Sequence, residues 1–117
     1  MNELLQYLLV ATNVAKKLHW ETKSFAVHIV LDELHGKLIE LTDELAEQYF
    51  GAFGNDINLD VNNAQVNIAS PQQFILDMVV KLEQFEPVLK DLDSLKNTYD
   101  ELKATALKTK YKLDNLK

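Results

Sequence analysis

The set His28, Asp32, Asp43 and Glu47 combines side-chain types that can bind a metal. Imidazole and carboxylate groups are the ligands expected for iron, manganese or zinc when thiolates are absent, and this chain has no cysteine. At 100° per residue, the three carboxylates fall about 40°, 60° and 100° around a helix from the histidine. All four therefore share one helix face, where ionisable groups beside apolar neighbours need a neutralising partner.

A single helix cannot gather this set around one ion, because about 16 Å along the axis separates Asp32 from Asp43. A second, antiparallel copy solves the problem if a two-fold axis passes near residue 37 or 38. The helix end with His28 and Asp32 in one chain then meets the helix end with Asp43 and Glu47 in the other. Gly36 lies close to that crossing and permits close approach of the two helices. The spacing thus predicts an isologous dimer with two equivalent intersubunit sites.

Two further histidines and the single tryptophan lie near this set. His19 could supply another ligand if the turn at residues 21–24 folds it back toward His28. His35 follows His28 by one heptad and is interpreted as structural or interfacial. Trp20 is typical of a core or interface anchor. A lone buried histidine is more often structural than a ligand, so the metal interpretation of His28 depends on its spacing from the three carboxylates.

The first half of the chain predicts two long helices. Apolar residues follow helical spacing from Asn2 to about Trp20. After the turn, Thr22 or Ser24 can cap a second helix over residues 25–50, which is expected to end at Gly51. Residues 52–69 interleave asparagine with β-branched and leucine residues, which indicates an extended crossover between elements that are not antiparallel neighbours.

The second half predicts two more helices. Ser70-Pro71 is typical of a helix start, and the third helix should reach about Gln84 or Glu86, with Pro87 ending or kinking it. Asp91 or Asp93 can cap a fourth helix. The expected fold class is therefore all-α, as a ferritin-like four-helix bundle with a long crossover between helices two and three, in a single domain over residues 1–117.

Composition narrows the classes of function. The net charge is −6, and all twelve basic residues are lysines, so the chain lacks the bidentate arginine fork that reads guanine or phosphate. DNA binding is therefore not expected, although lysines gather near the C-terminus. No apolar run is long enough for a bilayer span, and the start lacks the basic region of a signal peptide. These features predict a cytoplasmic location, in a host cell or a virion interior if the gene belongs to a phage.

The stretch Leu18-His19-Trp20, then Phe25 and His28 with Asp32, then Asp43-Glu44-Leu45-Ala46-Glu47, resembles the Dps family of ferritin-like mini-ferritins. The local likeness covers residues 18 to 51, and the four-helix layout extends it loosely to the whole chain. The phrase Thr22-Lys23-Ser24-Phe25-Ala26 with His28 also resembles short ferritin-like proteins of tailed phages.

The Dps resemblance implies a ferroxidase centre at a dimer interface. His19, His28 and Asp32 would come from one subunit, and Asp43 and Glu47 from its partner. The cofactor would be iron, in a di-iron or mono-iron site, although another divalent metal also suits these ligands. The partners would be Fe²⁺ and peroxide or oxygen, and the assembly a homodimer or a hollow dodecamer. The alternative is a non-catalytic structural or interaction protein, phage-encoded, that keeps the same fold.

Overall fold

In the computed structural model, which describes residues 1–89 and 92–116, the chain folds into α-helices and one short 3-10 turn, with no strand in that part of the chain. The four helices are α1 (Asn2–Glu21), α2 (Phe25–Phe53), α3 (Pro71–Leu89) and α4 (Asp93–Asn115), and the 3-10 turn is η1 (Val61–Asn63). The prediction of an all-α chain with four helices is confirmed for these residues. Each helix lies along the long axis of a body measuring 44 × 26 × 21 Å.

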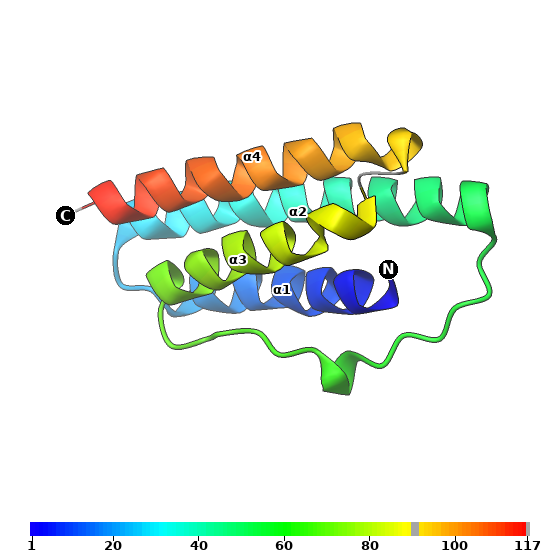
Figure 1. The fold of residues 1–117 in the computed structure, drawn as a ribbon. Helices are drawn as coiled ribbons and strands as arrows, with labels where there is room; N and C mark the ends of the chain where they lie inside the picture. The colour runs from blue at the N-terminus through cyan, green and yellow to red at the C-terminus, as the bar shows by residue number, and fades with distance from the viewer. Residues whose placement is uncertain (90–91, 117) are drawn as a thin grey trace.

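The helices pack side by side in the order α1, α2, α4, α3, and α3 closes the ring against α1 (Figure 1). Helices α1 and α2 form one antiparallel hairpin, and α3 and α4 form another. Helices α2 and α3 run in the same direction, so residues 54–70 must carry the chain back along the whole bundle. That path explains why the connection is long, as its composition predicted.

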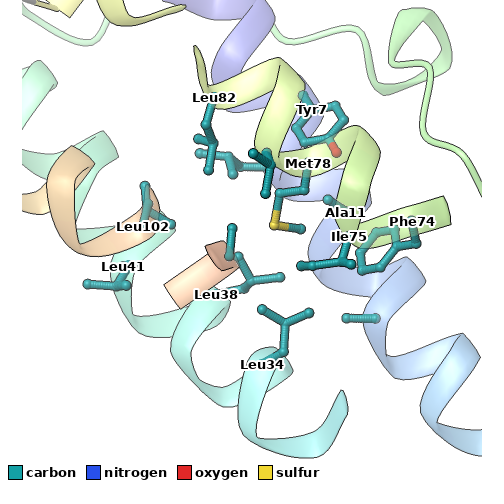
Figure 2. Packing of buried hydrophobic residues seen from close by; sticks show 14 of the residues in the cluster. Tyr7, Ala11, Leu34, Leu38, Leu41, Phe74, Ile75, Met78, Leu82 and Leu102 are labelled. Carbon is teal, nitrogen blue, oxygen red and sulfur yellow. The ribbon is translucent and has the colours of Figure 1, made fainter. Parts of the chain in front are cut away.

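Each helix buries one apolar stripe because its leucine-rich positions recur every three or four residues. Figure 2 shows side chains of all four helices meeting in this core. Its largest fully buried members include Leu4, Leu8, Leu31, Leu34, Leu38, Leu41, Leu45, Phe74, Ile75, Met78 and Tyr99. Three half-buried residues of the crossover, Ile57, Leu59 and Val66, pack against its edge.

Polar side chains fix the helices relative to one another. The Tyr7 hydroxyl of α1 donates to the Asp77 carboxylate of α3 over 3.1 Å. The Thr98 hydroxyl of α4 donates to the Gln48 side chain of α2 over 2.8 Å. The Tyr99 hydroxyl donates to the backbone carbonyl of Leu82, so α4 is also bonded to α3. These bonds limit sliding of one helix past another.

Two predicted helix ends were wrong. Helix α2 continues through Gly51 to Phe53, and Gly54 ends it with φ 84° while its N–H donates to the carbonyl of Phe50. Of the two glycines, only Gly54 has a positive φ, a backbone conformation that glycine adopts without strain. Helix α3 continues through Pro87 to Leu89. An interior proline removes one backbone hydrogen bond, and this helix tolerates it within its last turn.

The start of α4 also differs from the prediction. Asp93 is the first residue of the helix and not its cap, and Leu92 takes the cap position without a side-chain hydrogen bond. The Asp93 carboxylate still lies in the first turn, where negative charge complements the helix dipole. The other predicted cap, Asp91, lies outside the described residues. None of the described helices combines the length and apolar character needed for a bilayer span.

Candidate metal centre

The connection between α1 and α2 is short and held by its own side chains. Ser24 caps α2, because its hydroxyl accepts the backbone N–H of Val27 over 3.2 Å. The Thr22 hydroxyl accepts the backbone N–H of Ser24 over 3.2 Å. With only residues 22–24 between the helices, the last turn of α1 lies directly against the first turn of α2. This turn determines where His19 lies.

His19 and His28 stack on each other, with ring centroids 3.7 Å apart and ring planes inclined by 22°. The Nδ1 of His19 lies 2.7 Å from the backbone carbonyl oxygen of His28, and the Nδ1 of His28 lies 2.9 Å from the carbonyl oxygen of His19. A carbonyl can only accept, so each Nδ1 must carry a proton and donate it. When neutral, both imidazoles then present an unprotonated Nε2, the form in which histidine binds a metal.

The carboxylate of Asp32 lies beside this pair. Its Oδ1 is 3.8 Å from the Nε2 of His19 and 3.6 Å from the Nζ of Lys16. His19 is only 7% exposed, whereas the Asp32 side chain is 59% exposed. At 3.8 Å the Nε2 of His19 and the carboxylate oxygen of Asp32 are too far apart for a direct hydrogen bond. One chain thus brings three predicted ligands, His19, His28 and Asp32, to one end of the α1/α2 hairpin.

Asp43 and Glu47 lie at the other end of α2, both exposed. In the described residues of a single chain, no three His, Asp or Glu side chains come close enough to surround an ion. The five predicted ligands are therefore divided between two places, as the helix rise requires. Joining them needs a second chain, and the intersubunit site stays a prediction.

The outward face of α2 runs from the end with His28 and Asp32 to the end with Asp43 and Glu47. Its midline follows alternating steps of four and three residues: Phe25, Ile29, Asp32, Gly36, Ile39, Asp43, Ala46 and Phe50. Such steps form the a/d seam along which two helices pack in a coiled coil. All eight positions are exposed or half-buried in the single chain. A Cβ built on Gly36 would meet nothing within 4 Å, so no contact inside the chain requires glycine there.

Two features of the site were absent from the sequence prediction. Lys16 lies three residues before His19 on α1, a spacing that places both side chains on one face, and its Nζ lies 3.6 Å from Asp32. The second feature is the pair of reciprocal hydrogen bonds between the His19 and His28 imidazoles and backbone carbonyls. These bonds depend on the path of the turn, which helix periodicity does not describe.

His35 is not one of the three predicted ligands at this end of the hairpin. Burial lowers the pKa of His35 below its usual value; the charges of Lys16 and His19 lower it further, and Asp32 raises it. Its imidazole is therefore neutral near pH 7. Among the described residues, no hydrogen bond or ion pair joins His35 to the candidate ligands, and its interpretation as structural or interfacial stays a prediction.

The fold and the site define an all-helical protein with two stacked histidines at one end of a helical hairpin. The chain belongs to the family described as "Family of unknown function (DUF5856)", which matches residues 19–113 and so contains all five candidate ligands. It is also 26% identical over 113 residues to the "Uncharacterized 14.6 kDa protein in mobD-ri intergenic region" of Enterobacteria phage T4, which covers 96% of this chain and 86% of the phage protein. No solved structure matches the chain.

Proposed function

We propose that this chain is a ferritin-like, Dps-like protein that binds Fe²⁺ at sites shared between two antiparallel subunits and oxidises it. The observation that carries the proposal is the reciprocal pair His19–His28, because it turns both Nδ1 atoms toward carbonyls and leaves both Nε2 atoms for an ion. Ordered partners of this kind fix the orientation and tautomer of metal-binding histidines.

The symmetry of the α2 seam supports a shared site. Asp32 and Asp43 lie equally far from the midpoint between Lys37 and Leu38, as do the two ends of the seam. A two-fold axis at that midpoint brings Asp32 of one chain to the partner's Asp43. The two aspartates repel unless a cation lies between them, and a divalent ion with histidine neighbours meets that need.

The donor set fits iron. Two imidazoles and three carboxylates offer nitrogen and hard oxygen ligands, and the oxygens favour the Fe³⁺ product over Fe²⁺. Each Fe²⁺ would give one electron to peroxide or oxygen. Lys16, now 3.6 Å from Asp32, would move aside when the ion enters, which its flexible side chain allows.

The helix arrangement supports the ferritin-like interpretation of the fold. Two antiparallel hairpins, α1/α2 and α3/α4, are joined by the crossover of residues 54–70 between parallel helices. One long crossover of this kind distinguishes ferritin-like bundles from up-and-down bundles.

Anaerobic titration with Fe²⁺ followed by peroxide tests the proposal. The wild type should bind Fe²⁺ and oxidise it rapidly, whereas Asp43→Ala and Glu47→Ala should oxidise little. Glu44→Ala is the matched control, because Glu44 is exposed on the same helix turn and outside the candidate set. Equal rates in all four proteins would remove the ferroxidase function. Native mass separates a dimer from a storage shell.

A second function, a non-catalytic interaction protein of the same fold, is favoured by one contact. Lys16 already gives Asp32 a cationic neighbour without any metal. The phage relative is compatible with such a role. In that case the wild type should dimerise equally well with and without chelator and should leave Fe²⁺ unoxidised beyond the rate in buffer.

A further inference from the structure

We propose that Lys16 is a built-in competitor for the metal ion: its ammonium pairs with Asp32 in the metal-free chain, and only an ion that also binds imidazole displaces it efficiently. The proposal rests on the proposed function and concerns the regulation of that same site. Lys16 would set the affinity and the selectivity of the site without being one of its ligands.

The Lys16 ammonium approaches the same oxygen atom that lies beside His19. Its Nζ is 3.6 Å from Oδ1 of Asp32, and this oxygen is 3.8 Å from Nε2 of His19. A metal ion bound by both groups would lie about 2 Å from each of these two atoms. An ammonium that stayed in place would then lie close to a divalent ion and repel it, so the two cations compete for one carboxylate.

The local sequence of α1 leaves Lys16 to this carboxylate. The positions one turn away from it on the same helix contain no acidic residue: Thr12, Asn13, His19 and Trp20. Lys17, in contrast, pairs with Glu21 on its own helix, with Nζ 2.8 Å from Oε2. In the part of the chain that the structure describes, Asp32 is the carboxylate within ion-pair distance of Lys16. Two neighbouring lysines of equal charge therefore have different partners.

The charge of Lys16 acts beyond Asp32. Burial is the largest cause that lowers the pKa of His35, and the charge of Lys16 is the next; Asp32 acts in the opposite direction. The positive charge therefore influences an imidazole on the following turn of α2. A cation that enters between these residues would meet the same field.

The ion pair is open to water, so an ion can displace the lysine. The Lys16 side chain is 33% exposed and the Asp32 side chain is 59% exposed. Exposed ion pairs contribute little to stability, and the flexible lysine stem lets the ammonium move into solvent. Lys16 would therefore lower the affinity of the site without blocking it.

This competition favours some cations over others. A monovalent ion offers the carboxylate no more charge than the ammonium does. Mg²⁺ prefers oxygen ligands and keeps several of its waters, so His19 and His28 add little to its binding. Mn²⁺, Fe²⁺ and Zn²⁺ bind imidazole as well as carboxylate, and this second contribution offsets the loss of the lysine pair. Lys16 would thus favour the ions that use both histidines.

Calorimetric titration of the full chain with Mn²⁺ and with Zn²⁺ at low salt tests the proposal. Lys16→Met keeps a long unbranched side chain and removes the charge, so the affinity should rise about tenfold. Lys16→Arg keeps the charge and should give no gain. In about 1 M salt the gain of Lys16→Met should shrink, because salt screens the exposed charge that opposes the ion.

Lys17→Met is the matched control. It removes the same charge one residue away, from a lysine that pairs with Glu21 and not with Asp32. Its affinity should equal that of the wild type. The proposal is overturned if Lys16→Met binds no tighter than the wild type, if Lys17→Met gains as much as Lys16→Met, or if the gain is the same at high salt.

Failure of this proposal is distinct from failure of the proposed function. A wild type that binds metal, with Lys16→Met no tighter, would keep the metal site and remove the competitor. A wild type that binds no metal, with Lys16→Met binding it, would keep the competitor and remove the proposed function of the wild type. Absence of binding in both proteins would remove both proposals.

Discussion

His19 and His28 each donate the Nδ1 proton to the backbone carbonyl of the other, across stacked rings 3.7 Å apart. The two residues come from consecutive helices, so the same bonds close the hairpin and orient the imidazoles. A change to either residue must therefore affect both the closure of the hairpin and the orientation of the imidazoles. The carbonyls supply the orienting partners that metal-binding histidines require.

His19→Ala and His28→Ala should each lower metal affinity about 10- to 100-fold, because each removes a ligand and frees the other ring to rotate. His35→Ala is the control, since His35 is not a predicted ligand, and the metal affinity of this variant should equal that of the wild type. Calorimetric titration with Mn²⁺ or Zn²⁺ measures all three. An affinity unchanged by His28→Ala would contradict a metal site at this end of the hairpin.

Mixing two inactive variants tests whether the site is shared. The His28→Ala chain keeps the ligands Asp43 and Glu47, and the Asp43→Ala chain keeps His28 and Asp32. A heterodimer of the two variants therefore contains one intact site and one site that lacks both His28 and Asp43. Unfolding and refolding an equimolar mixture should recover about a quarter of the wild-type iron capacity, because half the dimers are mixed. No recovery, in a mixture shown by native mass to contain heterodimers, would mean that the ligands do not come from two chains.

Gly36→Ala should stabilise the isolated chain by about 0.5–1 kcal/mol, because alanine favours a helix and the new Cβ meets nothing. The same substitution should weaken dimerisation if α2 crosses its partner there, and Gly36→Leu should weaken it further. Gly51→Ala is the matched control on the same helix, also open around its Cβ and off the seam. Urea unfolding of dilute protein and sedimentation separate the two effects.

Tyr99 should make the stability of the bundle fall at high pH. Burial raises the pKa of Tyr99 to about 12, with further contributions from Glu86, Asp100 and Glu83. The Tyr99 hydroxyl keeps its proton to a higher pH in the folded chain than in the unfolded chain. The stability that the protonated hydroxyl contributes is therefore complete below pH 10 and is lost as pH rises from 10 to 12.

The loss can reach about 1.4 kcal/mol per pH unit for one such group. Tyr99→Phe should reduce this slope and should cost about 1 kcal/mol at pH 7, since the hydrogen bond to Leu82 is lost. Urea unfolding between pH 8 and 11, followed by circular dichroism, measures both values. An unchanged slope in Tyr99→Phe would assign the alkaline loss to other groups.

Local patterns in the sequence predict most of the helices. Leucine spacing and the Ser24 cap are enough to define α1 and the start of α2. The ends at Gly54 and Leu89 could not be predicted, because two glycines three residues apart are equally able to end α2, and a proline in the last turn of α3 costs little.

The candidate ligands follow from helix spacing, but their environment does not. Periodicity places Asp32 on the same face as His28, whereas the return of His19 depends on a three-residue turn. The proximity of Lys16 to Asp32 depends on how α1 lies against α2. Contacts between elements require the three-dimensional path of the chain.

Helix α2 runs unbroken for 29 residues and contains no proline. Its length, about 43 Å at 1.5 Å per residue, spans nearly the whole 44 Å of the molecule. In the proposed dimer, this rigid rod would hold the two shared ions about 22 Å apart, well beyond the screening distance of about 8 Å in physiological salt. The two ions would therefore hardly repel each other, and each site could bind and release its ion independently of the other site.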